Sequence, residues 1–544
     1  MAPLMDDNAD TVGSTAHTSH TDAPYRPRFL IIGAGSRGTA YAAAIVRSNL
    51  GIVAAVAEPI TFKRTLLGLT YIWPGAEPEP QQEFTSWKTF LAYEQHRRKN
   101  ASAGNRTTPP GIDGVFVCVK DNLHCRIVTA LAPLGLHVMC EKPLATSLPD
   151  CLSIQRTLSH HPQRIFAIGH VLRYSPHNML LRHLVREQRV IGDVLSLEHT
   201  EPVGWWHFSH SYVRGQWRRE GTSAPSLLTK SCHDIDFILW LLCSPPPDDL
   251  EAAPHLPSSV SSAGALKLFR RSRKPKAAGA ATNCLSCPIK ESCMYSAPRT
   301  YHDRHLAKGI TKWPVDIVNP EIPHILSTSG PDAAKSALMD SLAEDYDIRS
   351  TPVEDIEARP WYGRCVWESD NDVVDDQIVT FTWDGDDDIE GARADRHGSR
   401  GPKTAVFHMI AHSLAQCERR GRIYGATGEI EYDSKCITVH DFTTGTSRTH
   451  SPEVPATSHH GGGDDGLTAM FVRAVAAVET GDQGVEEAQR EFWGCTVEEV
   501  VRSHAAVFAA EEARKRGTVV DWARWWAANV TRALDAEGVA RGGS

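Results

Sequence analysis

The sequence lacks any apolar run that approaches the roughly 20 residues needed to cross a lipid bilayer as a helix. It also lacks an excess of positive charge, because 57 lysines and arginines stand against 66 aspartates and glutamates, a net charge of −9. The stretch from Met1 to Asp22 has no apolar core of the kind found in secretory signals. These absences predict a cytoplasmic protein with no membrane and no nucleic-acid partner.

Paired cysteines are not predicted either, although the chain contains thirteen cysteines, an odd number scattered over its length. In a reducing compartment most of them should be free thiols, some of which pack as small hydrophobic groups. The one markedly basic run, Arg270–Lys276, is flanked by proline and is interpreted as a solvated loop rather than a binding patch.

Strand-like and helix-like segments alternate in the first part of the chain. The residues 28–32, 52–57, 114–119 and 137–140 are almost all apolar, and helical patterns separate them. This alternation predicts a doubly wound parallel sheet that is covered on both faces.

The pattern changes after Pro143. The segments 194–201, 373–383, 405–411 and 422–432 alternate between apolar and polar residues, whereas 467–479 and 485–516 are helical in pattern. We therefore predict an α/β protein whose C-terminal domain contains a large, mostly antiparallel open sheet.

The first strand runs directly into a glycine-rich turn that contains Gly33, Gly35 and Gly38. In such a turn the first glycine allows the tight bend, the second lets the backbone approach a pyrophosphate, and the third packs helix against strand. The N-terminus of the following helix, at Ser36 and Arg37, offers free N–H groups and a favourable dipole to phosphates. These residues are candidate dinucleotide ligands.

Glu58 ends the second strand at about the expected distance from the turn. A carboxylate there accepts hydrogen bonds from ribose hydroxyls and repels a 2′-phosphate, so NAD is favoured over NADP. Arg64 lies close enough in the sequence to leave that preference open.

Glu141-Lys142-Pro143 follows the fourth strand, at the edge of a parallel sheet where ligands bind. With this tripeptide the chain resembles the Gfo/Idh/MocA family of oxidoreductases, in particular a subgroup with a CxxC…CxYSA cysteine pattern. The other matching positions are the glycine turn, the stretch from Val119 through Asn122 to His124, and His233.

The resemblance implies an N-terminal Rossmann domain over 26–148, after a disordered tail at 1–25. It implies a substrate and oligomerisation domain over 149–544, in which we expect insertions near 244–281 and 384–402. It also implies a homo-oligomer, dimer or tetramer, and NAD(P)-linked oxidation or reduction of a sugar, polyol or similar substrate.

The same resemblance assigns catalytic roles. Lys142 would contact substrate and nicotinamide, and His233 would act as acid and base, which suits an imidazole with an ordinary pKa near ~6.5. Lys230 is a third catalytic candidate. Many relatives carry an aspartate four residues before the histidine, where this chain has Thr229.

Two polar and aromatic clusters are candidates for the substrate wall, because sugar sites combine aromatic faces with forked donors. They comprise His170, Arg173, Tyr174, Trp206, His207, His210, Arg214 and Trp217.

Cys284, Cys287 and Cys293 stand within ten residues of one another and form a candidate site for a structural zinc ion or another soft metal. A fourth ligand would come from Cys232, Cys365, His302 or His305, and an iron–sulfur cluster would need a similar set. Free thiols that pack a loop are the alternative.

The leading interpretation is an NAD(P)-dependent enzyme that transfers hydride between nicotinamide and a secondary alcohol or ketone. The alternative enzyme uses tightly bound NAD to cleave a glycoside through a transient keto-sugar, with no net production of NADH. A non-enzymatic nucleotide sensor is the third alternative, and the presence of both Lys142 and His233 argues against it.

Overall fold

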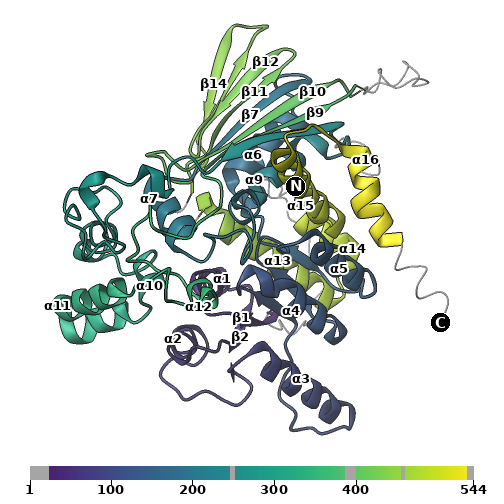
Figure 1. Ribbon diagram of the computed structural model, residues 1–544. Coiled ribbons are helices and arrows are strands. Elements are labelled where there is room, and N and C mark those ends of the chain that lie inside the picture. Colours follow the sequence, from purple (N-terminus) through teal and green to yellow (C-terminus); the bar gives the residue numbers. More distant parts are fainter. Residues whose placement is uncertain (1–23, 246–251, 386–399, 455–459, 536–544) are drawn as a thin grey trace.

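The computed structural model describes residues 24–245, 252–385, 400–454 and 460–535. Figure 1 shows a parallel sheet with its helices at one end of the molecule and a larger open sheet at the other. Nearly all of the expected tail, 1–25, lies outside the described residues, and so do 246–251 and 386–399 within the two expected insertions.

The first sheet is parallel, as predicted. Its described strands are β1 (Arg28–Ile32), β2 (Ile52–Ala57), β3 (Glu83–Phe84), β4 (Gly114–Val117), β5 (His137–Cys140) and β6 (Phe166–Ile168), in the order β3-β2-β1-β4-β5-β6. In the central pairs Phe29 lies opposite Val53 on one side and Gly114 on the other. Because helices cover both faces, nearly every strand residue is buried, which explains the continuous apolar runs.

Five helices connect these strands: α1 (Ser36–Ser48), α2 (Thr61–Tyr71), α3 (Trp87–Ser102), α4 (His124–Leu131) and α5 (Leu148–Ser159). The helix α1 begins within the glycine turn, so its N-terminus lies at the carboxyl edge of β1. The strand β6 extends this sheet beyond residue 148, where we placed the domain boundary. The boundary itself remains a prediction.

The second sheet is mixed and mostly antiparallel, as predicted. Its described strands are β7 (Val194–Pro202), β8 (Ser259–Ala265), β9 (Asp376–Trp383), β10 (Lys403–Ile410), β11 (Arg420–Gly425), β12 (Gly428–Tyr432), β13 (Ile437–Asp441), β14 (Thr446–His450) and β15 (Val520–Asp521). Their order is β14-β13-β12-β11-β7-β10-β9-β8-β15, and the pairing of β10 with β7 is parallel. Alternate residues of β10 are buried, which matches the period-two pattern of the sequence.

Helices of the C-terminal part lie on one face of this sheet, between the two sheets and, for the residues 315–358, to one side of both (Figure 1). They are α6 (Pro176–Arg182), α7 (Trp205–Phe208), α8 (Ser226–Thr229), α9 (Cys232–Cys243), α10 (Val315–Val318), α11 (Ile322–Ala343), α12 (Val353–Ala358), α13 (Gly463–Thr480), α14 (Val485–Ala488), α15 (Val497–Arg516) and α16 (Trp522–Trp526). The helix α15 packs on α9 and β8, and α13 packs on α1 of the first sheet. The ring centroid of Phe471 on α13 lies 5.7 Å from that of Phe29 and 5.3 Å from that of Phe116. The two sheets therefore share one continuous apolar core.

Three predictions about elements need correction. The residues 259–265 lie within an expected insertion, yet they form β8 inside the sheet. The segment 422–432 is not one strand, because a short turn separates β11 from β12. The segment 485–516 is not one helix, because Gly494, with φ +62°, ends the first helical stretch before α15 begins.

None of the helices in the described residues is both long and apolar enough to cross a membrane.

Candidate active site

The glycine turn has the geometry that a dinucleotide requires. Gly33 has φ +97°, and a Cβ at this position would lie 2.3 Å from the carbonyl oxygen of Cys118. A Cβ at Gly38 would lie 1.9 Å from the carbonyl oxygen of Gly33. A Cβ at Gly35, by contrast, would meet no atom within 4 Å. The fold therefore demands the first and third glycines, whereas the second borders open space at the N-terminus of α1 where a pyrophosphate fits.

Glu58 lies directly beside this turn. Its carboxylate accepts hydrogen bonds from the N–H of Ala34 at 2.9 Å and from the N–H of Ile60 at 2.9 Å. Arg64 donates to the carbonyl oxygen of Glu58 at 2.7 Å and pairs with Glu83 at 3.3 Å. Because its guanidinium already has these partners, Arg64 gives no support to a 2′-phosphate site.

Arg37 does not point freely toward a phosphate. Its guanidinium pairs with Glu141 at 2.6 Å and with Asp464 of α13 at 2.9 Å, and it also donates to the Tyr41 hydroxyl at 2.8 Å. Burial alone would raise the pKa of Glu141, but the charge of Arg37 and the hydroxyl of Tyr41 hold it below its ordinary value. Arg37 therefore links α1 to α13 and to Glu141-Lys142-Pro143, which we call the EKP segment.

Lys142 extends from the end of β5 to the second part of the chain. Its Nζ donates to the carbonyl oxygen of Thr229, at the end of α8, at 2.7 Å. The acceptor of this hydrogen bond is thus a backbone carbonyl and not a carboxylate. Thr229 is four residues before His233, so this hydrogen bond links Lys142 to the segment that leads into α9.

The loop after β4 lines a cavity of about 240 Å³. Asn122 contributes to its wall together with Trp217, whose indole N–H donates to Asp121 at 2.8 Å. His124 is buried below the loop, with its ring nitrogens 2.7 Å from the carbonyl oxygen of Pro143 and 3.3 Å from that of Val119. Val119 and His124 thus connect this loop to the EKP segment, and Asn122 lies on the cavity.

His233 lies at the N-terminus of α9 and is 3% exposed. Its Nε2 is 2.8 Å from a guanidinium nitrogen of Arg419 and 3.3 Å from Asp234. Burial lowers the pKa of His233 far below its ordinary value, and the negative charge of Asp234 only partly opposes this shift. The ring is therefore neutral at pH 7. Since arginine can only donate, Nε2 accepts and Nδ1 carries the hydrogen.

Lys230 belongs to a buried group of charges around His233. Its Nζ lies 2.9 Å from Glu201 and 3.1 Å from the Cys417 sulfur. Burial would lower the pKa of Lys230, but Cys417 and Glu201 outweigh this effect and raise it. Lys230 is accordingly a permanent cation and not a base near pH 7.

Sequence reasoning missed the partners of His233 and Lys230. Arg419 pairs with Asp234 at 2.5 Å and with Glu201 at 2.9 Å, and Asp234 is also 3.0 Å from His199. Cys417 has φ +57°, and its sulfur is 3.5 Å from Nδ1 of His207. Asp234 is next to His233 in the sequence, whereas Glu201, Cys417 and Arg419 are distant from both His233 and Lys230, so the sequence held no signal for these three.

Three predicted substrate residues are core residues instead. Arg173 forms a two-point ion pair with Asp236 at 2.7 and 2.8 Å, and His170 lies 3.1 Å from the same carboxylate. The Tyr174 hydroxyl donates to the carbonyl oxygen of Trp493 at 2.7 Å. Because these side chains are buried and engaged with core partners, the structure does not bring them to a substrate wall.

The other candidates for the substrate wall do not lie together. His207 lies beside Cys417, and the ring centroids of Trp206 and Trp313 are 5.0 Å apart. His210 is 2.9 Å from the hydroxyl of Tyr301 in the interior. Trp217 lines the cavity described above, whereas Arg214 points toward Cys284. Of the eight candidates for the wall, only Trp217 lines the 240 Å³ cavity.

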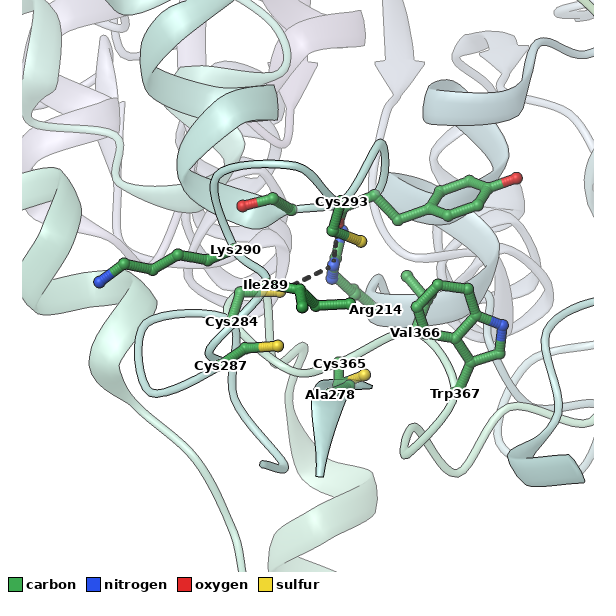
Figure 2. Close-up of a pocket in the computed structure, with 12 residues that line it drawn as sticks. Arg214, Ala278, Cys284, Cys287, Ile289, Lys290, Cys293, Cys365, Val366 and Trp367 are labelled. Atoms are coloured by element: carbon green, nitrogen blue, oxygen red, sulfur yellow. Dashed lines mark hydrogen bonds between the residues drawn. The ribbon is translucent and has the colours of Figure 1, made fainter. Parts of the chain in front are cut away.

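The three cysteines of the metal motif border a second, smaller cavity with Cys365 (Figure 2). The other proposed fourth ligands, Cys232, His302 and His305, are not among the residues that line it. Cys232 lies instead near His170 and His504. Because His504 bonds the Leu144 N–H at 2.8 Å and the Val500 carbonyl at 2.8 Å, both of its ring nitrogens are engaged within the protein.

Comparison with known proteins supports the first part of this picture. Residues 27–170 match the family model GFO_IDH_MocA, described as an oxidoreductase family with an NAD-binding Rossmann fold. The match covers the first sheet and the helices that connect its strands. The matched residues include the glycine turn, Glu58 and Lys142.

Curated relatives of this Gfo/Idh/MocA segment match over a similar stretch. A 2,7-anhydro-N-acetylneuraminate hydratase of Escherichia coli is 30% identical over 131 residues, 24% of this chain and 34% of that protein. An inositol 2-dehydrogenase of Saccharopolyspora erythraea is 28% identical over 134 residues, 25% of this chain and 36% of that protein. The chain thus matches only about a third of the length of these relatives.

Solved structures extend the likeness of fold to both sheets. A levoglucosan dehydrogenase in complex with NADH and L-sorbose has a TM-score of 0.56 at 13% identity, covering 91% of this chain and 98% of that one. An oxidoreductase domain protein from Kribbella flavida has a TM-score of 0.54 at 13% identity, covering 91% and 99%. Because these matches cover most of the chain, the similarity of fold includes both sheets.

Proposed function

We propose that this protein is an NAD-dependent oxidoreductase that interconverts a secondary alcohol and a ketone on a sugar, polyol or glycoside derivative. The observation that carries the proposal is the convergence of Lys142, from the Rossmann edge, on Thr229 and the α9 segment that holds His233. A nicotinamide, when bound, supplies or removes the hydride. The open space over Gly35, at the N-terminus of α1, would accommodate the pyrophosphate of the cofactor. The carboxylate of Glu58 would accept hydrogen bonds from its adenosine ribose.

The contacts of His233 favour roles for His233 and Lys142 that differ from those predicted from the sequence. Because Arg419 holds Nε2, the imidazole offers a substrate oxygen only the N–H at Nδ1, which has no partner among the described residues. A neutral ring held in this way orients the oxygen and does not take its proton. Lys142 is the better proton carrier. In reduction one N–H bond of its ammonium breaks as the O–H bond of the alcohol forms, and in oxidation the amine accepts that proton.

The fixed charges around the site support this assignment. Lys230 stays positive beside Glu201, so it contributes a constant field. That field and the ammonium group of Lys142 both favour a developing negative charge on the substrate oxygen. The cavity of about 240 Å³ next to Asn122 and Trp217 offers space for ligand groups.

The deciding experiment presents the purified protein with NAD⁺ or NADP⁺ and a panel of inositols, aldoses, uronic acids and glycosides. We expect continuous production of NADH with at least one of them, and a clear preference for NAD⁺ over NADP⁺ because of Glu58. The relatives include dehydrogenases and a hydratase, so products are also analysed by chromatography. Cleavage or hydration without net NADH would replace this proposal with a redox-neutral reaction.

A further inference from the structure

Four cysteines from two distant stretches of chain converge on one cavity. Cys284, Cys287 and Cys293 lie in the loop that follows β8, and Cys365 lies between α12 and β9. A short bridge aligns the two stretches: the Cys284 N–H donates to Gly363 at 2.8 Å, and the Cys365 N–H donates to Thr282 at 2.8 Å. Figure 2 shows the four sulfurs arranged around the cavity. The fold thus supplies a complete set of four thiol ligands, none of which forms a disulfide.

The spacing of these sulfurs is too wide for a single zinc ion. With Zn–S bonds of about 2.3 Å, a tetrahedral site holds its four sulfurs about 3.8 Å apart. Here no three of the four sulfurs lie within 4.8 Å of one another, although a buried cluster elsewhere in the described residues meets that limit. The enclosed cavity measures about 10 Å³, about the space of one water-sized sphere. Such a sphere does not fit at the centre of a zinc tetrahedron, so the thiols are set for a larger group.

A buried arginine provides an independent sign of an anionic ligand. Arg214 is 1% exposed and lines the same cavity. Its guanidinium donates to the carbonyl oxygens of Arg364 and Tyr295, each at 2.6 Å, and to the Cys284 sulfur at 3.4 Å. Among the described residues no carboxylate forms an ion pair with Arg214, and its Nη1 has no hydrogen-bond partner there. A buried cation without a counter-charge is costly, and four metal-bound thiolates would supply that charge.

We propose that Cys284, Cys287, Cys293 and Cys365 bind an iron–sulfur cluster, with Arg214 as its buried counter-cation. Inorganic sulfide and iron between the thiolates account for the wide spacing of the cysteine sulfurs. The N–H···S bond from Arg214 is of the kind that tunes such clusters. The cluster would join the 282–298 loop to the loop before β9, and this structural role is independent of the proposed hydride transfer.

The test is to purify the full-length protein without oxygen or chelators and to measure iron, acid-labile sulfide and zinc per chain. We expect iron and sulfide in equal amounts, at least about two of each, with broad visible absorption and an EPR signal after reduction by dithionite. The variants Cys365→Ser and Cys287→Ser should each lose at least nine-tenths of the iron, whereas Cys436→Ser, in the turn between β12 and β13, should retain it.

Folding is checked separately in each variant by size exclusion and circular dichroism, and iron is measured only in the monodisperse fraction. Cys287 is partly exposed, so its substitution disturbs packing less than that of Cys365. One zinc per chain without iron would overturn the proposal, as would a metal-free protein that takes up neither iron nor sulfide on anaerobic reconstitution. Full iron retention in folded Cys365→Ser would also overturn it.

Discussion

At the scale of single residues, the chemistry of a side chain depends on the partners that the fold provides. Arg173 and Lys142 both appear to be substrate ligands in the sequence, yet Arg173 is locked to Asp236 in the core. Lys142 is half-buried and keeps two of its three N–H groups beyond its bond to Thr229. A buried, fully paired cation holds structure, whereas a partly exposed one with spare donors can act on a ligand.

Replacing Lys142 tests its role in proton transfer. Lys142→Met keeps a similar length and removes the ammonium group, so we expect turnover to fall by about a hundredfold or more. The affinity for NAD⁺, measured by isothermal titration calorimetry, should stay within a few-fold because the pyrophosphate and ribose contacts are elsewhere. Lys88→Met, on the exposed side of α3, is the matched control and should be fully active. Unchanged turnover in Lys142→Met would remove this residue from the mechanism.

At the scale of elements, the turn between β1 and α1 separates what folding requires from what binding requires. Its outer glycines face backbone oxygens at distances that forbid a side chain, and Gly35 does not. The sequence motif treats all three glycines alike. The structure assigns two of them to the packing of helix on strand and leaves the middle one facing open space.

Two alanine substitutions exploit this difference. Gly38→Ala should lower the free energy of unfolding by about 1–3 kcal/mol, because its Cβ would overlap the Gly33 carbonyl. Gly35→Ala should unfold at nearly the wild-type temperature, since its φ of −80° suits alanine, but should bind NAD⁺ about tenfold more weakly. Thermal denaturation and calorimetry measure the two effects. If Gly35→Ala bound NAD⁺ as tightly as the wild type, the pyrophosphate would not approach this position.

The element boundaries that the sequence prediction missed have two kinds of cause, one local and one long-range. Thr496 and Glu499 form a capping box at the start of α15, with hydrogen bonds of 3.2 and 2.9 Å, and Gly494 ends the preceding helical stretch. This start signal was present in the sequence. The strand β8 had no such signal, because Ser259–Ala265 consists of small and polar residues. Pairing with β9 and β15, which are distant in sequence, makes it a strand.

At the scale of the whole molecule, helices from the end of the described chain complete the core of the first sheet. The helix α13 places Phe471 against Phe29 and Phe116, and Asp464 pairs with Arg37 next to the glycine turn. Loss of the α13 contacts would therefore expose the Rossmann core and free the arginine beside the candidate cofactor site.

Several buried histidines make the stability of the whole molecule sensitive to pH. Burial lowers the pKa of six of them: His137, His207, His210, His233, His305 and His504. It lowers the pKa of His210 and of His504 to about 3. Unfolded histidines take up protons below about pH 6.5 while these folded ones stay neutral, so the unfolded state binds more protons there. Stability is complete above that pH and falls as the pH decreases toward 3.

Urea unfolding at several pH values measures this dependence. Between pH 8 and 7 we expect a nearly constant free energy of unfolding, followed by a decline between pH 6 and 5. Each fully neutral histidine contributes up to about 1.4 kcal/mol per pH unit to that decline. The low pKa of Asp236, which Arg173 maintains against burial, adds a further loss only below about pH 4. A free energy that stays constant from pH 7 to 5 would contradict the assignment of neutral buried rings.

The sequence by itself determined the parallel sheet, the glycine turn with its acidic neighbour, and the place of Lys142 at the end of β5. These features depend on contiguous residues, whose periodicity and turn chemistry are local. Only the tertiary structure decided that Arg37 and Arg173 are tied in ion pairs, that Arg419 holds His233, and that Cys365 completes the thiol cluster. Each of these depends on a contact between residues that are distant in the chain, and the energy of a buried charge or thiol is set by such partners and not by its neighbours in sequence.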